Sequence, residues 1–219
     1  MSNRTLQGKS FLILKCRAER IPLRDNSVRL ALATPPYLGA PRVRQEECPT
    51  QDKRRYKEFL RTLVEEAGRI LRPGGHLLLH TGRCPVKRVK GARRIEFFVL
   101  RKPKQTSRQT PRRVGTEWFA TQFTRVQGIR WVALGVSLYR ELVCRYSEPG
   151  DLVADVFSGS GNAALAALLL LRKPILIDLH HHRKVRERLE GALRRERRRR
   201  GSARWRRSPK SVEALRKPF

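Results

Sequence analysis

The sequence LVADVFSGSGNAALAALLLLRKPILID, at residues 152–178, decides the fold class of this chain. It begins with a short apolar run, Leu152 to Val156, which predicts a buried strand. A glycine-rich loop follows, then a stretch rich in Ala and Leu that predicts a buried helix, and then a second apolar run that ends at Asp178. Nucleotide-binding β-α-β units have this order of strand, glycine loop, helix, strand and acid, so we expect an α/β, Rossmann-like fold.

The loop from Asp155 to Asn162 is a candidate cofactor site. Its glycines let the backbone approach a bound molecule closely, and the helix that follows begins with N–H groups available to a ligand. Asp178, at the end of the next strand, could accept hydrogen bonds from both hydroxyls of a ribose. On the residues alone the plainer alternative stays open, namely a tight turn and an acid that caps a helix.

A second candidate site lies earlier in the chain. Residues 11–14 and 28–33 are apolar runs that predict buried strands, and the second run ends at Thr34-Pro35-Pro36-Tyr37. Prolines cannot extend the ladder, so the chain leaves the sheet at the carboxyl end of that strand, where α/β folds bind their ligands. A rigid loop with a hydroxyl and free carbonyls could hold an exocyclic amine, and Tyr37 could stack on a base. The alternative is a Pro-Pro loop with a packed tyrosine.

The remaining elements are predicted from periodicity. Residues 52–71 carry apolar side chains at three- and four-residue spacing and predict a helix that Pro73-Gly74-Gly75 ends. A strand is expected from His76 to His80 and a helix from Trp131 to Tyr146. Residues 82–130 are rich in Arg, Lys, Gln, Thr and Pro, so we expect an insertion that projects from the sheet and is too polar for the core.

The composition indicates a polyanionic partner. The chain has 219 residues with a net charge of +31, which favours nucleic acid over a membrane surface. No apolar run reaches the roughly 20 residues of a membrane-spanning helix, and we expect a cytoplasmic protein. Four scattered cysteines without a CxxC pair predict reduced structural thiols rather than a zinc site or disulfides. The histidines at 180–182 are interpreted as a solvated cluster rather than as metal ligands.

Taken together, the two loops resemble the permuted (beta-class) DNA amino-methyltransferases, the N-4/N-6 DNA methylases that modify adenine-N6 or cytosine-N4. In that family a Ser/Asp/Asn-Pro-Pro-aromatic motif precedes an Asp-Pro-Phe-x-Gly-Ser-Gly motif. The likeness runs from about Phe11 to Leu189. It also includes Ile21-Pro22-Leu23, Asn26-Ser27-Val28, Leu71-Arg72-Pro73-Gly74-Gly75 and Pro149-Gly150-Asp151.

The resemblance implies a site-specific methyltransferase that uses S-adenosyl-L-methionine and needs no metal. Its catalytic residues would be Thr34, Pro35, Pro36 and Tyr37. Its cofactor-binding residues would be Asp155, Phe157, Gly159, Ser160, Gly161, Asn162 and Asp178. The partner would be double-stranded DNA with the target base flipped out, and the setting a restriction-modification system whose nuclease the sequence does not identify.

The resemblance also implies an organisation. Residues 1–182 would form the methyltransferase domain, with a catalytic half at 1–81, a target-recognition insertion at 82–130 and a cofactor-binding half at 131–182. Residues 183–219 would form a basic C-terminal helix and tail.

The chain departs from the family pattern at a few positions. Thr34 stands in place of Ser, Asp or Asn, and Val156 in place of proline. Arg17 and Arg29 stand where relatives often carry acids. Two alternatives to DNA methylation therefore stay open. One is an RNA amine methyltransferase, which the order of the motifs disfavours, and the other is a nucleic-acid-binding relative that no longer turns over.

Overall fold

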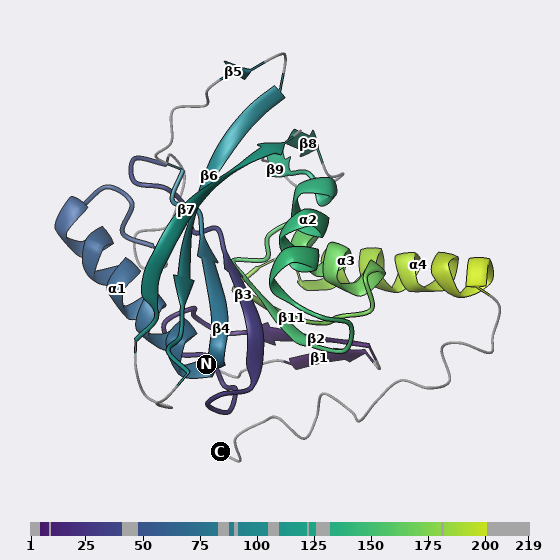
Figure 1. The fold of residues 1–219 in the computed structure, drawn as a ribbon. Coiled ribbons are helices and arrows are strands. Elements are labelled where there is room, and N and C mark those ends of the chain that lie inside the picture. Colours follow the sequence, from purple (N-terminus) through teal and green to yellow (C-terminus); the bar gives the residue numbers. More distant parts are fainter. Residues whose placement is uncertain are drawn as a thin grey trace.

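A computed structural model describes residues 5–8, 10–40, 48–82, 88–89, 92–104, 110–121, 123–125, 132–180 and 182–200. These residues form four helices and eleven strands (Figure 1). The helices are α1 (Lys53–Ile70), α2 (Val136–Tyr146), α3 (Asn162–Leu169) and α4 (His182–Arg200). The strands are β1 (Thr5–Gly8), β2 (Phe11–Lys15), β3 (Val28–Ala33), β4 (Leu71–Leu79), β5 (Arg88–Val89), β6 (Ala92–Arg101), β7 (Arg112–Thr121), β8 (Phe123–Arg125), β9 (Val132–Leu134), β10 (Leu152–Val156) and β11 (Lys173–Asp178).

One large sheet organises the molecule. Its strand order is β1-β2-β11-β10-β3-β4-β6-β5, with β7 paired to β6. The five strands from β2 to β4 are parallel, whereas β1 and the β6–β7 hairpin are antiparallel additions at the two edges. This arrangement confirms the predicted α/β, Rossmann-like fold class. Strands β8 and β9 form a separate two-stranded ribbon.

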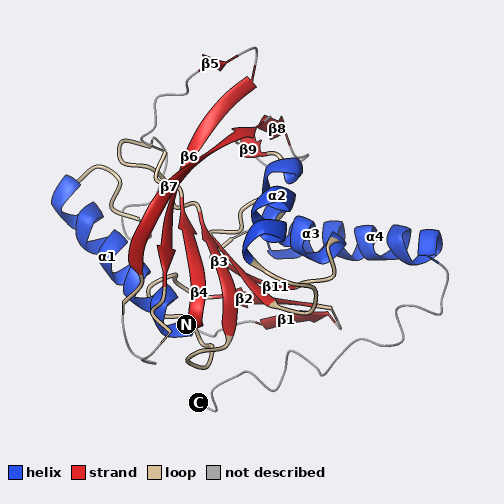
Figure 2. Cartoon of the chain, in the orientation of Figure 1, coloured by secondary structure: helices blue, strands red, loops and turns tan. Residues whose placement is uncertain are grey.

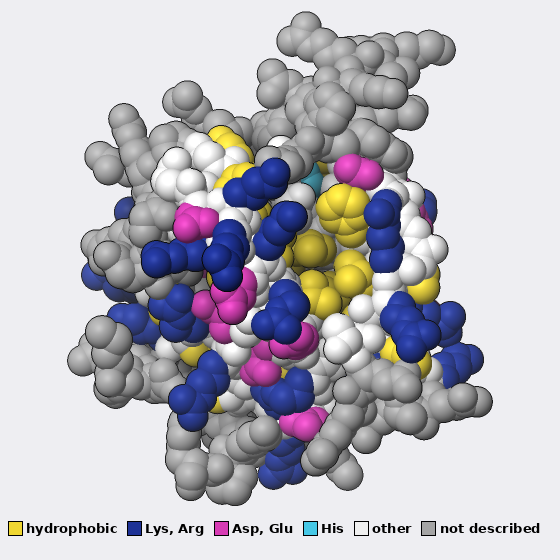
Figure 3. Space-filling view, turned by 90° about the vertical axis from the view of Figure 1, so that its left-hand side faces the viewer, with side chains coloured by type: hydrophobic (Ala, Val, Ile, Leu, Met, Phe, Trp, Pro, Cys, Tyr) yellow, Lys and Arg dark blue, Asp and Glu magenta, His cyan; other side chains and the backbone are white. Residues whose placement is uncertain are grey.

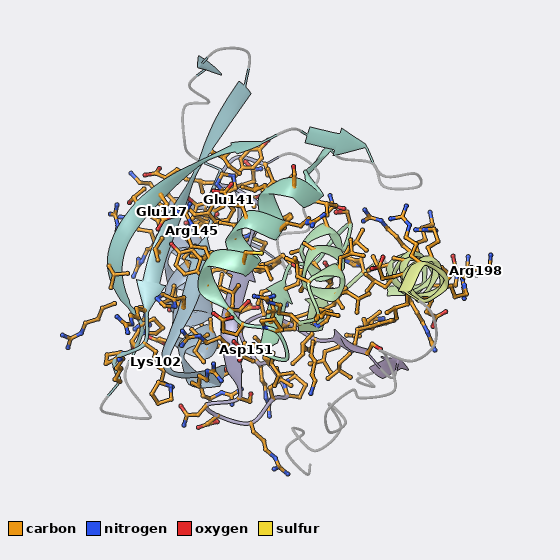
Figure 4. All side chains as sticks on the ribbon, turned by 45° about the vertical axis from the view of Figure 1, so that its right-hand side comes forward. Lys102, Glu117, Glu141, Arg145, Asp151 and Arg198 are labelled. Carbon is orange, nitrogen blue, oxygen red and sulfur yellow. The ribbon has the colours of Figure 1, made fainter. Side chains whose placement is uncertain are left out.

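Helices cover both faces of the sheet (Figure 2). On one face α1 packs against Ala31 and Ala33 of β3, and on the other α2 and α3 pack against Leu30 and Leu32 of the same strand. This alternation is what a strand buried on both faces requires, because successive side chains point to opposite sides. The basic helix α4 joins the core through Val185 and its apolar neighbours, which pack on β2, β11 and α3. Its opposite side is exposed and basic, with Arg198 labelled in Figure 4.

A partly buried polar network fixes the loop before β3. The Arg69 guanidinium, in the last turn of α1, donates to the backbone carbonyls of Ile21 and Leu23 at 2.7 and 2.8 Å. It also pairs with Glu66 and Asp25, each at 2.7 Å. Neighbouring carboxylates raise the pKa of Arg69, so the cation is retained. Charge-assisted bonds of this kind add to the packing of Ile21 and Leu23, whose side chains are buried in the core.

The structure corrects one interpretation of the middle of the chain. Parts of the stretch expected to project from the sheet, residues 92–101 and 112–121, extend the sheet as β6 and β7 instead. Alternate residues of β6, namely Ile95, Phe97 and Val99, are buried against α2. The prediction was wrong because the arginines of this hairpin dominate its composition, while only every second residue faces the core.

Two boundaries also differ from the sequence predictions. Residues 132–134 form strand β9, so helix α2 begins at Val136 rather than at Trp131, which lies outside the described residues. Strand β4 begins directly after α1 at Leu71 and contains Pro73 and both following glycines. No helix of the described residues is long and apolar enough to cross a membrane.

Candidate active site

The two candidate loops meet at the centre of the sheet. Strands β3 and β10 are parallel neighbours, with Ala33 opposite Val156 at their carboxyl ends. The backbone N–H of Thr34 donates to the Val156 carbonyl at 3.4 Å, so the two loops begin side by side. From here the chain runs from β3 to α1 on one face and from β10 to α3 on the other. Such a switch in direction leaves a crevice at the carboxyl ends of the strands, where open α/β sheets bind ligands.

The glycine loop has a backbone that few side chains tolerate. Phe157, Gly159 and Gly161 have positive φ angles of 65°, 43° and 72°. A Cβ added to Gly161 would lie 2.5 Å from Cγ1 of Val185 in α4, so this glycine serves both conformation and close packing. Phe157 is a non-glycine residue in a left-handed conformation, and strain of this kind is concentrated at functional sites. Its ring packs against Phe59 of α1, with the ring centroids 6.0 Å apart.

Asp178 holds the glycine loop at the end of β11. One carboxylate oxygen accepts the backbone N–H of Gly159 at 2.7 Å, and the other accepts the N–H of His180, also at 2.7 Å. The side chain is only partly buried, which keeps it at the surface of the crevice. Each carboxylate oxygen can accept more than one hydrogen bond. Asp178 can therefore support the loop and still accept bonds from a ligand.

Asp155 has a different environment. Its carboxylate is buried beneath the loop and accepts the backbone N–H of Ala164, in the first turn of α3, at 3.1 Å. Burial raises the pKa of Asp155 to about 7, and the nearby Asp178 carboxylate contributes to the rise. The structure places Asp155 as a support for the loop and the helix start.

The other residues expected to bind the cofactor turn partly into the protein. The Asn162 side chain donates to the Leu134 carbonyl at 2.6 Å and ties α3 to β9. The Ser160 carbonyl accepts the Arg188 guanidinium at 2.5 Å, which links the loop to α4. The ligand-facing part of the loop therefore consists mainly of backbone, as expected where glycines are required.

The Pro-Pro loop is anchored from α1. The Pro36 carbonyl accepts the hydroxyl of Tyr56 at 2.9 Å, so this carbonyl is already engaged. Pro35 is buried, whereas Tyr37 is 48% exposed. A Cβ added to Gly82 would lie 2.6 Å from Cβ of Tyr37, so the chain after β4 passes closely behind the tyrosine. An exposed aromatic ring on a rigid loop can stack on a base.

Two tyrosines at this site were not predicted to be functional. Tyr56 belongs to the periodic apolar face that predicts α1, and nothing in the pattern separates it from a core residue. Tyr139, in α2, is buried and is hydrogen-bonded to the Thr34 side chain. The hydroxyl of a buried tyrosine needs a hydrogen-bond partner. This general requirement is the only indication of a role for Tyr139 that the sequence contains.

The residues that depart from the family pattern have structural partners. Arg17 forms an ion pair with Glu19 at 2.9 Å, and Arg29 donates to the Gly74 carbonyl at 3.0 Å. His80 bonds the Glu96 carbonyl at 2.8 Å, and the centroid of the His76 ring lies 5.1 Å from that of the Tyr146 ring. No group of His, Cys, Asp or Glu suited to a metal occurs among the described residues.

The surface beside α1 combines cations with apolar area. Figure 3 shows a hollow in which hydrophobic side chains are visible, with Lys and Arg around it. Partly buried apolar residues on this side come from α1 and β6, among them Leu60, Val64, Phe98 and Leu100. The first turns of α1 add exposed cations at residues 53, 54, 55 and 57, within one helical turn of Tyr56, whose hydroxyl bonds the Pro-Pro loop. Cations around apolar and aromatic side chains suit a nucleic acid strand.

The segment that contains the glycine loop matches a known family. Residues 132–185 match the family model described as DNA methylase. This range holds α2, the glycine loop and Asp178, while the Pro-Pro loop lies outside it. This match confirms the predicted resemblance for the part of the chain that holds the glycine loop. No curated protein matches the sequence.

Solved structures share the fold at low identity. A proposed DNA modification methylase from Thermus thermophilus superposes with a TM-score of 0.52 at 18% identity, covering 78% of this chain and 89% of that one. A structure of the same protein in complex with S-adenosyl-L-methionine gives a TM-score of 0.52 over 80% of this chain and 91% of that one, at 18% identity. The cytosine-N4-specific PvuII DNA methyltransferase gives a TM-score of 0.53 at 14% identity, covering 84% and 93%.

Proposed function

We propose that this chain is a DNA methyltransferase that transfers a methyl group from S-adenosyl-L-methionine to the exocyclic amine of adenine (N6) or cytosine (N4). The observation that carries the proposal is the meeting of the glycine loop and the Thr34–Tyr37 loop at the carboxyl ends of two adjacent parallel strands. The match of residues 132–185 to a DNA methylase family supports DNA over RNA as the substrate. The net charge of +31 agrees with a nucleic acid partner.

The residues of the glycine loop fit the cofactor. Positive φ angles at Gly159 and Gly161 bring backbone rather than side chain to the crevice, and Asp178 offers its carboxylate beside them. A ribose needs acceptors for its two hydroxyls, and an adenine needs an apolar surface such as that of Phe157. When bound, this cofactor supplies an electrophilic methyl group on a sulfonium. The chain's own residues have to exclude water from it and present the amine.

Replacing Asp178 by Ala is expected to weaken S-adenosyl-L-methionine binding by about 1.5–2 kcal/mol, because hydrogen bonds to a charged group are lost. Asp151→Ala is the matched control. Asp151 pairs with Arg72 at 3.0 Å and lies just before β10, at the end of that strand that is away from the glycine loop. Calorimetric titration measures both variants. Equal affinities for Asp178→Ala and the control would contradict the cofactor assignment.

The Pro-Pro loop is proposed to hold the amine. A flipped base would stack on the exposed ring of Tyr37, while its amine donates to the Thr34 hydroxyl and to the Pro35 carbonyl. Drawing both amine hydrogens to these oxygens directs the nitrogen lone pair toward the methyl group. The nitrogen would then attack the sulfonium methyl group directly, without a covalent enzyme intermediate. The N–C bond would form as the C–S bond breaks, the cofactor would leave as the neutral thioether, and the amine proton would pass to water. Positioning and electrostatics supply the catalysis.

Thr34→Val is expected to lower the rate of methyl transfer about tenfold or more, because it keeps the side-chain shape but removes the hydroxyl acceptor. Thr34→Ser retains the hydroxyl and is expected to keep the rate of the unaltered chain or to raise it. Transfer of labelled methyl groups to unmodified DNA measures the rate, with cofactor affinity checked for each variant. If the unaltered chain binds cofactor and DNA but transfers no methyl group, the enzyme proposal fails and a nucleic-acid-binding role replaces it.

Target recognition is proposed for residues 82–130, whose described part is largely the β6–β7 hairpin. This hairpin continues the sheet beyond β4, next to the strand that leads into Gly82 and the back of Tyr37. Arg112 and Arg113 are exposed on it. Side chains on such a hairpin can reach base edges, whereas the basic C-terminal region at 183–219 is proposed to contact phosphates.

A further inference from the structure

The alternation of side chains along the two central strands places Thr34 and Asp155 on the same face of the sheet. In β3, Leu30 and Leu32 face α2 and α3, so Thr34 continues that side. In β10, Val153 faces the same helices, and Asp155 follows it two residues later, bonded to α3. Because β3 and β10 are direct neighbours, both polar groups lie under α2.

Tyr139 of α2 occupies the space next to them. Its ring belongs to the apolar cluster that includes Leu30, Leu32 and Val153, so the ring is fixed by packing. Its hydroxyl is hydrogen-bonded to the Thr34 side chain and lies close enough to Asp155 to feel its charge. Burial first, and Asp155 second, raise the pKa of Tyr139, so the phenol stays protonated.

The two hydroxyls have a preferred direction. Each has one proton to donate and two lone pairs. The hydrogen bond with Thr34 lowers the pKa of Tyr139, against the effect of burial, as expected when the Thr34 hydroxyl donates and the phenol oxygen accepts. The Thr34 proton is then donated to Tyr139, and both lone pairs of Thr34 remain for other donors.

We propose that Tyr139 is a positioning residue for methyl transfer: its phenol oxygen accepts a hydrogen bond from the Thr34 hydroxyl. The Thr34 oxygen is then left to act only as an acceptor for the target amine. This inference rests on the proposed function, in which Thr34 receives an amine hydrogen. Without Tyr139, the Thr34 hydroxyl can rotate and point its own proton at the amine, which opposes the required geometry.

The experiment is a double-mutant cycle on the rate of methyl transfer at saturating cofactor and DNA. Tyr139→Phe is expected to lower the rate about five- to tenfold, the effect of one lost hydrogen bond. In a Thr34→Val background the same substitution is expected to change the rate less than twofold, because no hydroxyl is left to orient. In a Thr34→Ser background the five- to tenfold loss is expected to return. Cofactor affinity and the KM for DNA should not change.

Tyr146→Phe is the matched control. Tyr146 is a second buried tyrosine of α2, two turns further along, and its hydroxyl bonds Glu117 of β7 beside Arg145 (Figure 4). Loss of that hydroxyl is expected to leave the rate unchanged. An equal rate loss for both tyrosine variants would mark a packing effect and overturn the proposal.

A second cycle, on urea unfolding, tests the contact without turnover. Tyr139→Phe is expected to lower the folding equilibrium constant about fivefold in the unaltered chain and less than twofold in Thr34→Val. Additive effects on folding or on rate overturn the positioning role. Absence of methyl transfer by the unaltered chain instead defeats the proposed function and this inference with it, so the two failures are distinguishable.

Discussion

Replacing Lys102 by Met is expected to lower the free energy of unfolding by about 2–5 kcal/mol, because two buried acceptors lose their donor. Lys102 has no exposed surface, and its ammonium donates to the Asn26 side chain and to the Gly68 carbonyl, both at 2.8 Å (Figure 4). Gly68 lies in the last turn of α1, whose carbonyls have no partner within the helix. A cation at that end also offsets the helix dipole.

Lys104→Met is the control for this prediction, because Lys104 is exposed two residues further along the same chain. Its replacement is expected to change the free energy of unfolding by no more than about 0.5 kcal/mol. Urea unfolding followed by circular dichroism measures both variants. If the two substitutions are equally mild, the Lys102 ammonium does not hold α1 to the loop before β3.

Replacing Asp155 by Asn is expected to change the pH dependence of stability by about 2–3 kcal/mol between pH 5 and pH 8. The carboxyl titrates near pH 4 in the unfolded chain and at about 7 in the folded chain. The folded state therefore binds the proton more tightly, and the stability from neutral Asp155 is full below about pH 4 and is lost as the pH rises through about 7. Asn cannot ionise, and its amide oxygen can still accept the Ala164 N–H.

Unfolding titrations in urea at pH 5, 6, 7 and 8 measure this difference. Other titrating groups, such as His76 with a pKa lowered to about 4 by burial, are shared by both proteins and cancel in the comparison. The free energy of unfolding of Asp155→Asn is expected to rise relative to that of the unaltered chain at each step toward alkaline pH. Parallel pH profiles would show that Asp155 is ionised in the folded state across this range.

The central elements could be predicted from the sequence because the pattern that identifies each one lies within its own residues. Strands such as Val28–Ala33 and Leu152–Val156 are continuous apolar runs, and the helix over 53–70 shows a clear period. The glycine loop and the Pro-Pro loop were recognisable because glycine and proline are used where the backbone conformation requires them. The positive φ of Gly161 is an example.

Other features depend on partners that are distant in the chain. The hairpin of β6 and β7 resembles a solvated insertion in composition, and it is a part of the sheet only because Leu77 of β4 pairs with Leu100. Tyr139 and Thr34 lie more than a hundred positions apart, and only the packing of α2 under β3 joins them. In the sequence, Lys102 cannot be told apart from the other cations of a basic stretch. Its role follows only from its two acceptors, which are distant in the chain.

The strand order has a consequence for how this protein is made. Strands β2 and β3 follow one another in the chain but are separated in the sheet by β11 and β10, which are the last of the described strands to be synthesised. A nascent chain that ends before residue 152 therefore exposes two apolar strand edges without their neighbours. Pairings this distant in sequence form slowly, since the loop must close before any contact stabilises it. Until β10 and β11 are made, the unpaired edges of β2 and β3 can pair with strands of another chain. The high positive charge of the chain opposes such self-association at that stage.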